Sequence, residues 1–294
     1  MNKEFVPWQN YWDKKSQIET SRGKFNVYST ENNNNYNFVL FCIHGAGHSG
    51  LSFSLIAKTL KGICDVIAPD LKCHGETDGD PSVDLSIDNL VDDVISIYET
   101  VKKVDKKMLI MGHSLGGSIG THVAYKVKPE GLFVIDTIEG TAMMSLPRMK
   151  YILKARPREF KSQSDAIRYA SQSGEMSNEE SAEISVQGRV KMNAKGKYVW
   201  ITDLYPSEKD WVGWFKGFGD KFIKLPVYKV LILPNINNMD KTFIVGHMSG
   251  KFQLEIVNGS NHCVHEDKPE AVARIVEKFI QRISISIPEW NFDS

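Results

Sequence analysis

The sequence has no long apolar run, no net charge and no basic cluster. Its hydrophobic stretches fall far short of the about 20 residues that a helix needs to span a bilayer. Lysine plus arginine and aspartate plus glutamate number 36 each. A chain without a net field or a basic patch offers little attraction to nucleic acid or to an anionic lipid surface. We therefore expect a protein that binds neither nucleic acid nor membrane.

Two features indicate an intracellular location. The four cysteines, Cys42, Cys64, Cys73 and Cys263, form no C-x-x-C pair, which favours reduced thiols over disulfides. Residues 1–8 carry charge where a secretory signal peptide would need an apolar core. We expect a soluble protein of the cytoplasm, the nucleus or both. Nothing in the sequence indicates a stable oligomer, so we expect a monomer.

Short apolar runs alternate with longer amphipathic stretches along the chain. The expected strands are 25–28, 38–43, 65–68, 108–111, 132–135, 230–233 and 253–257, and the expected helices are 51–60, 85–101, 117–127 and 269–283. Several of the strand runs are continuously apolar, as in strands that are buried on both faces. The alternation predicts an α/β protein with a doubly wound, mostly parallel sheet. We expect one domain over residues 1–294.

The stretch from about 141 to 225 interrupts this alternation. It is polar and helical in pattern, with helices expected at 162–173, 178–190 and 208–222. Trp and Phe side chains cluster in the last of these, which suits a partly apolar substrate pocket. The stretch therefore predicts a helical cap insertion over the active-site face, although it could instead cover an edge of the sheet.

Residues 112–117 read Gly-His-Ser-Leu-Gly-Gly, between an apolar run and a helix-like stretch. A G-x-S-x-G motif between a strand and a helix is typical of a nucleophile elbow. A side chain at position 112 or 116 would collide with the neighbouring strand and helix, so glycine is required. The motif predicts Ser114 as a nucleophile, and the amide of Leu115 as an oxyanion donor at the helix N-terminus. The alternative is a tight glycine-rich turn without catalytic function.

A serine nucleophile needs a base, and the chain has eight histidines. In proteins with such a nucleophile elbow, the base lies late in the chain, on a loop after the last strand. His262 occupies that position and is the leading candidate. His265 is the alternative, but it lies beside Glu266 and Asp267, where carboxylates suit the start of a helix.

The base needs an acidic partner that holds its tautomer. Asp136 directly follows the apolar run 132–135, at the end where parallel strands meet the active site. Asp240 lies several residues beyond the run 230–233, after a stretch that holds asparagines in place of a carboxylate. We favour Asp136 and keep Asp240 as the alternative.

The small residues His44-Gly45-Ala46-Gly47 follow the expected strand 38–43. Small side chains after an apolar strand let a backbone amide approach a substrate, so Ala46 is the expected second oxyanion donor. We expect no cofactor and no metal. The pairs His44 with His48 and His262 with His265 lack the helical spacing and the carboxylate cluster that a metal site needs.

Several short blocks, in the expected core and in the insertion, carry a family resemblance. They are 5–8, 44–49, Asp70 with 74–77, 112–117, Asp136 with 139–143, 211–215, 250–253 and 264–267. Together they resemble the protein phosphatase methylesterases from about residue 5 to residue 283. The Glu-Gly-Thr-Ala-Met, Trp-Val-Gly-Trp-Phe and Gly-Lys-Phe-Gln blocks are the most specific, because they lie in the insertion and at its borders.

The resemblance implies an α/β-hydrolase fold and a defined reaction. Such enzymes remove the methyl ester from the C-terminal leucine of the type 2A protein phosphatase catalytic subunit, which they also bind and can inhibit. Matched by motif, the catalytic residues are Ser114, Asp136 and His262. The chain departs from longer relatives in lacking an acidic insertion near 191–197, and Asn261 replaces a common glycine. A general carboxylesterase or lipase, and a phosphatase-binding inhibitor without catalysis, remain the alternatives.

Overall fold

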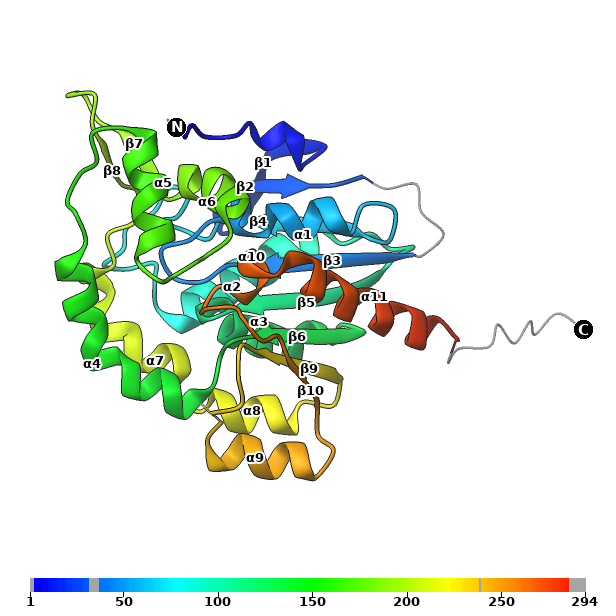
Figure 1. Cartoon of the computed structure of the whole chain (residues 1–294). Coiled ribbons are helices and arrows are strands. Elements are labelled where there is room, and N and C mark those ends of the chain that lie inside the picture. The colour runs from blue at the N-terminus through cyan, green and yellow to red at the C-terminus, as the bar shows by residue number, and fades with distance from the viewer. Residues whose placement is uncertain (1–2, 32–36, 238, 286–294) are drawn as a thin grey trace, which may run out of the picture.

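A computed structural model describes residues 3–31, 37–237 and 239–285 of the chain (Figure 1). Its main sheet has eight strands in the order β1-β2-β4-β3-β5-β6-β9-β10. These are β1 (Lys14–Thr20), β2 (Gly23–Ser29), β3 (Phe38–Ile43), β4 (Asp65–Pro69), β5 (Lys107–His113), β6 (Gly131–Ile135), β9 (Tyr228–Leu233) and β10 (Gln253–Ile256). Strands β4, β3, β5, β6, β9 and β10 run parallel, β2 pairs antiparallel with β4, and β1 pairs antiparallel with β2 at the edge. The expected doubly wound, mostly parallel sheet is confirmed.

Helices cover both faces of this sheet (Figure 1). The helices of the described residues are α1 (Ser54–Thr59), α2 (Ile87–Val101), α3 (Leu115–Val127), α4 (Glu139–Ala155), α5 (Gln163–Gln172), α6 (Glu179–Ser185), α7 (Trp211–Phe215), α8 (Phe218–Lys224), α9 (Lys241–Met248), α10 (Val264–Asp267) and α11 (Pro269–Ile285). Within the described ranges, no helix is both long and apolar enough to cross a membrane.

The continuous apolar run of β3 shows why the central strands lack alternation. Val39, Phe41 and Ile43 contribute to the core beneath α2 and α3. The intervening residues contribute to a second core beneath α1 and α11. Successive side chains of a strand point to opposite faces, so a strand between two helical layers must be apolar at every position. The sheet therefore holds the ends of its parallel strands in fixed positions, and the loops at those ends form the candidate site.

Elements with weaker patterns differ from expectation. Strand β1 was not expected, because it reads Lys-Lys-Ser-Gln-Ile-Glu-Thr and lies partly exposed at the edge of the sheet. Helix α4 lies mostly in the stretch expected to be helical, but no helix was expected at its bounds, because only Leu153 of its side chains is buried and Pro147 lies inside it. An edge strand and a surface helix bury too little to impose an apolar period on the sequence.

The segment between β6 and β9 contains α4 to α8 and a two-stranded sheet of β7 (Val190–Met192) and β8 (Tyr198–Trp200). The expectation of a helix over 178–190 is wrong at its end, because α6 stops at Ser185 and residue 190 begins β7. The expected helix 208–222 is divided into α7 and α8 at Gly217, whose φ of 80° breaks the helix.

The aromatic side chains of this region belong to the core. Trp211, Trp214, Phe215 and Phe218 are all buried and contact the cluster that includes α2 and α3. The indole of Trp214 donates a hydrogen bond of 2.7 Å to the carbonyl of Leu85, which fixes α7 on the body of the protein. These aromatics therefore pack as ordinary core, and their spacing is not by itself evidence of a substrate pocket.

Candidate active site

Ser114 lies in the sharp turn between β5 and α3. Its φ of 52° and ψ of −120° are strained for a non-glycine residue. A Cβ on Gly112 would lie 2.1 Å from the carbonyl oxygen of Gly116, and one on Gly116 would lie 2.1 Å from that of Ile43. No side chain fits at such distances, which confirms the steric reason for both glycines.

Hydrogen bonds from the neighbouring strand hold this turn. The amide of Ser114 donates to the carbonyl of Ile135 at 3.0 Å, and the hydroxyl of Thr137 donates to the carbonyl of Ser114 at 2.8 Å. As the first residue of α3, Leu115 has an amide without an acceptor in its own helix. The turn thus combines a serine side chain with an amide that can bind an oxyanion.

Asp136 and His262 meet beside the turn. His262 Nδ1 lies 2.7 Å from Asp136 Oδ2, in a pair whose imidazole side chain is 48% exposed and whose carboxylate is 16% exposed. Asp136 adopts a φ of 45° directly after β6, and its amide donates to Ile232 at 2.8 Å. Because a carboxylate only accepts, His262 donates from Nδ1 and its Nε2 is left to accept a proton.

The electrostatics of this pair suit a base. Desolvation lowers the pKa of His262, but the hydrogen bond and the charge of Asp136 outweigh it, so the pKa is raised above its ordinary value. The backbone of His262 is also anchored, because Nε2 of His113 donates to its carbonyl at 3.0 Å. The hydrogen bonds of the described residues include none from Ser114 Oγ.

The loop after β3 lies against Ser114. A Cβ on Gly45 would be 3.2 Å from the Cβ of Ser114, which places the neighbouring Ala46 beside the turn. Gly47 donates its amide to His74 Nε2 at 2.9 Å. Desolvation lowers the pKa of His74 to about 4, so the ring stays neutral and keeps an acceptor nitrogen for this loop.

The structure separates the favoured base and acid from their alternatives. His265 is fully buried, its ring lies 4.7 Å from that of Phe53, and neither ring nitrogen has a partner among the described residues. Asp240 caps α9 by accepting from the amide of Phe243 at 3.0 Å, and also accepts from Gly140 at 2.9 Å. Neither residue forms the imidazole–carboxylate pair that His262 and Asp136 make.

Asp70 supports the site, although the sequence did not identify it as a site residue. Asp70 is buried and accepts amide hydrogen bonds from Gly50 at 2.7 Å and Glu76 at 2.9 Å, which tie together the loops after β3 and β4. Desolvation raises its pKa to about 6, although these hydrogen bonds oppose the shift. In the sequence, only the block of Asp70 with residues 74–77 drew attention to this residue. That block indicated a family but not the structural role of Asp70.

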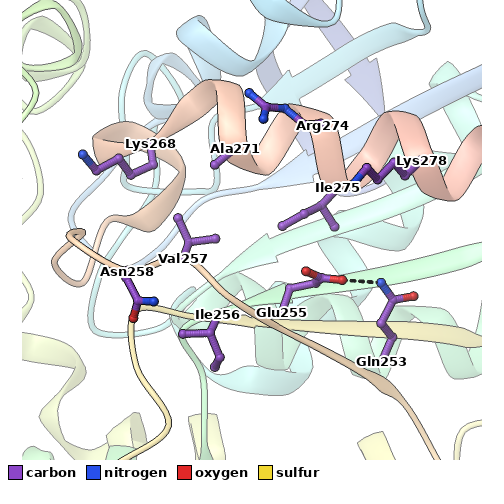
Figure 2. Close-up of a pocket in the computed structure, with 10 residues that line it drawn as sticks. All are labelled: Gln253, Glu255, Ile256, Val257, Asn258, Lys268, Ala271, Arg274, Ile275 and Lys278. Atoms are coloured by element: carbon purple, nitrogen blue, oxygen red, sulfur yellow. Dashed lines mark hydrogen bonds between the residues drawn. The ribbon is translucent and has the colours of Figure 1, made fainter.

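A separate pocket of about 400 Å³ lies between β10 and α11 (Figure 2). Its lining side chains are Gln253, Glu255, Ile256, Val257, Asn258, Lys268, Ala271, Arg274, Ile275 and Lys278. None of Ser114, Asp136 and His262 belongs to it. The chemistry of the candidate site therefore does not depend on this pocket.

The parallel sheet, the serine turn and the late histidine define a class of protein. Residues 39–275 match the model of the alpha/beta hydrolase family. A solved E-2-(acetamidomethylene)succinate hydrolase superposes with a TM-score of 0.76, at 17% identity, over 91% of this chain and 99% of its own. The chain is an α/β hydrolase, in agreement with the fold expected from the sequence.

Curated relatives narrow this class. Protein phosphatase methylesterase 1 of Schizosaccharomyces pombe is 38% identical over 94% of this chain and 84% of its own length. The human protein of that name is 32% identical over 98% and 87%, and a probable one from Caenorhabditis elegans is 33% identical over 97% and 80%. The chain belongs to the protein phosphatase methylesterase family. The resemblance seen in the sequence is confirmed, and the chain is an esterase.

Proposed function

We propose that this esterase removes the methyl ester from the C-terminal leucine of the type 2A protein phosphatase catalytic subunit, using Ser114, His262 and Asp136. The observation that carries the proposal is the Asp136–His262 hydrogen bond of 2.7 Å, made by a residue that follows β6, the neighbour of β5, and a residue that follows β10. The names of the relatives support a protein phosphatase as substrate.

The proposed reaction is acyl transfer. Ser114 Oγ attacks the ester carbonyl carbon while His262 Nε2 takes the hydroxyl proton, and Asp136 stabilises the imidazolium. The tetrahedral intermediate then expels methanol, which takes the proton from His262. Water then gives a proton to the same imidazole and attacks the acyl-serine, and the imidazole returns that proton to Ser114 Oγ as the free leucine carboxylate is released. Each step leaves the charge of Asp136 unchanged.

Two backbone amides complete the proposal. The amides of Ala46 and Leu115 hold the oxyanion, because Ala46 lies in the loop against Ser114 and Leu115 begins α3. An amide at a helix N-terminus lies at the positive end of the helix dipole. Loss of one such donor costs about 10²–10³ in rate.

Selectivity must come from the acyl side, because the leaving methanol offers almost nothing to recognise. We assign this role to the segment of about residues 141–225, as a cap on a single hydrolase domain over 1–294. Its α4 presents Met144, Tyr151 and Ile152 to solvent, with exposed fractions of 74%, 75% and 61%. Exposed apolar side chains on one helix suit contact with a protein substrate.

The experiment is methyl release from the methylated phosphatase catalytic subunit. Ser114→Ala is expected to lower the rate by about 10⁴-fold or more, because the nucleophile is lost. The matched control is Ser96→Ala on α2, which is expected to retain the full rate. Methyl release that persists in Ser114→Ala would contradict the proposed mechanism.

A nitrophenyl ester distinguishes the alternatives. A general carboxylesterase or lipase would hydrolyse that ester efficiently and leave the methylated phosphatase untouched. A binding inhibitor without catalysis would lower phosphatase activity equally well as the Ser114→Ala variant and would release no methanol. The proposed enzyme releases methyl from the phosphatase and loses this activity with Ser114.

A further inference from the structure

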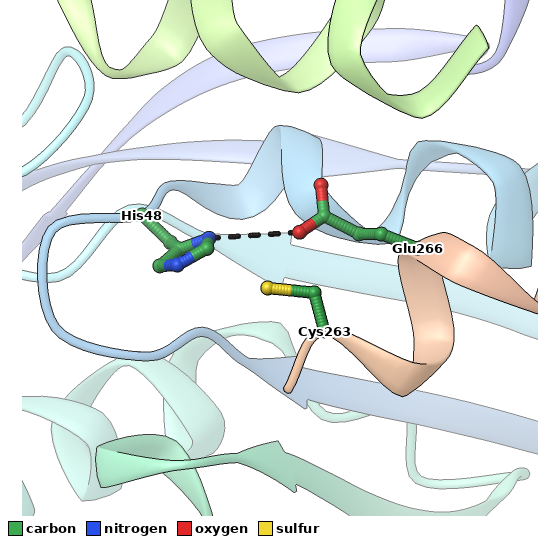
Figure 3. A group of neighbouring side chains, drawn as sticks. All are labelled: His48, Cys263 and Glu266. Atoms are coloured by element: carbon green, nitrogen blue, oxygen red, sulfur yellow. Dashed lines mark ion pairs between the residues drawn. The ribbon is translucent and has the colours of Figure 1, made fainter. Parts of the chain in front are cut away.

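A second cluster of reactive side chains lies behind the candidate site. His48 follows β3, Cys263 immediately precedes α10, and Glu266 lies within α10 (Figure 3). All three are buried, and one potential ligand atom from each lies within 4.8 Å of the others. The catalytic proposal uses none of them.

The tautomer of His48 directs a lone pair into this cluster. His48 Nε2 lies 3.0 Å from a carboxylate oxygen of Glu175, and since a carboxylate only accepts, Nε2 carries the proton. Nδ1 has no hydrogen-bond partner among the described residues and lies 3.6 Å from Glu266 Oε2. A histidine whose other nitrogen donates to a carboxylate is the usual arrangement of a metal-bound imidazole.

The charges around the cluster leave room for a cation. Arg189 Nη2 lies 2.9 Å from both carboxylate oxygens of Glu175, so those two charges compensate each other. Glu266 offers a carboxylate, and Cys263 offers a thiolate once its buried thiol has lost its proton, which together balance a doubly charged ion.

Glu266 is poorly satisfied without such an ion. Neither of its carboxylate oxygens has a hydrogen-bond partner of normal geometry in the described part of the chain. The hydroxyl of Ser185, the thiol of Cys263 and the charge of Arg189 are among the nearby groups that act on this carboxylate. A buried carboxylate facing an unprotonated imidazole nitrogen requires either a proton or a cation between them.

We propose that His48 Nδ1, Cys263 Sγ and one Glu266 oxygen bind a single thiophilic divalent cation of the Zn²⁺ class. The thiol proton leaves as the sulfur–metal bond forms, and water fills the fourth position. Tetrahedral zinc holds such ligand atoms about 3.3–3.8 Å apart, and His48 Nδ1 and Glu266 Oε2, at 3.6 Å, already meet this separation. Glu175, whose side chain is 27% exposed, separates the cluster from solvent and supports His48.

A cation bound at this cluster acts on the candidate base, His262, because Cys263 directly follows it in the chain. Coordination of Cys263 Sγ constrains the loop that carries His262 relative to Ser114. Misplacement of a catalytic group by about 1 Å costs up to about 10²-fold in rate. The bound cation therefore inhibits the esterase, and a chelator restores it.

Cobalt titration of the full-length, metal-free protein tests the site without any ester substrate. One equivalent of Co²⁺ is expected to produce a thiolate-to-cobalt charge-transfer band, which Zn²⁺ then abolishes. Cys263→Ala is expected to lose the band. Cys64→Ala, which removes a buried cysteine outside the cluster, is expected to keep it. Absence of the band, or its persistence in Cys263→Ala, overturns the proposal.

A conservative variant guards against loss of fold. Glu266→Gln keeps the shape of the side chain and is expected to weaken Zn²⁺ binding about tenfold or more. Glu270→Gln on the exposed start of α11 is expected to bind as tightly as the unmodified protein. Equal affinity in both variants, with unchanged circular dichroism, contradicts the ligand set. A nitrophenyl ester hydrolysed at an unchanged rate when the site is full overturns the inhibition.

Discussion

His262 Nδ1 lies 2.7 Å from Asp136 Oδ2, although the two residues are 126 positions apart in the chain. Asp136 follows β6 and His262 follows β10, and β9 lies between those strands in the sheet. The loop of His262 therefore spans the end of β9 to reach the carboxylate. The raised pKa of His262 is the electrostatic consequence of this pairing.

Removal of the charge at Asp136 tests its role. Asp136→Asn is expected to lower kcat by about 10⁴-fold, because an amide can donate to Nδ1 and stabilise the wrong tautomer of His262. The control is Asp240→Asn, since asparagine also caps a helix well. A large loss of kcat in Asp240→Asn with full activity in Asp136→Asn would reverse the assignment of the acid.

The pH profile of kcat/KM reports the same pair. The base must be neutral to accept the serine proton, so activity is lost as pH falls through the pKa of His262. Because Asp136 raises that pKa, the acid limb is expected above the ordinary histidine value of about 6.5. In Asp136→Asn the residual activity should show this limb at lower pH. A limb that does not move contradicts the electrostatic account.

Steric constraint at the turn predicts a stability effect. Gly116→Ala is expected to lower the free energy of unfolding by about 3 kcal/mol, because its Cβ would overlap the carbonyl of Ile43. The control is Gly213→Ala in α7, where no atom lies within 4 Å of the added Cβ. That change should be neutral or stabilise by up to about 1 kcal/mol. Urea unfolding measures both, and equal values would contradict the steric argument.

We expect a substitution of His74 to lower kcat, although this residue is not one of the proposed catalytic residues. His74→Ala removes the acceptor of the Gly47 amide, so the loop that carries Ala46 loses its anchor. We expect kcat on a nitrophenyl ester to fall about tenfold or more, because the oxyanion donor is displaced. His247→Ala on the exposed face of α9 is the control and should leave kcat unchanged. Equal kcat values in the two variants would contradict a role of this loop in catalysis.

The elements that the sequence predicts well are those that the core constrains at every residue. Apolar runs located β3, β5 and β6, and the position of Asp136 after one of them selected it over Asp240. The polar edge strand β1 and helix α4 bury too little to leave a pattern. Asn261 in place of a glycine did not prevent the His262 loop from reaching Asp136.

Three-dimensional proximity explains what the sequence could not predict. His48 and Cys263 are far apart in the chain, and only the fold brings the cluster of His48, Cys263 and Glu266 together. The close spacing of Trp211 and Trp214 suits a pocket, but both side chains lie in the buried core. Spacing alone cannot tell a buried aromatic from one that lines a cavity.

Covalent labelling of Ser114 by a fluorophosphonate, followed by methyl release from the methylated phosphatase, tests whether this serine performs the reaction. We predict one label per chain, located on Ser114 by mass spectrometry, and loss of methyl release in proportion to labelling. Replacement of His262 by alanine should slow the labelling. Methyl release that continues after Ser114 is fully labelled would contradict the account.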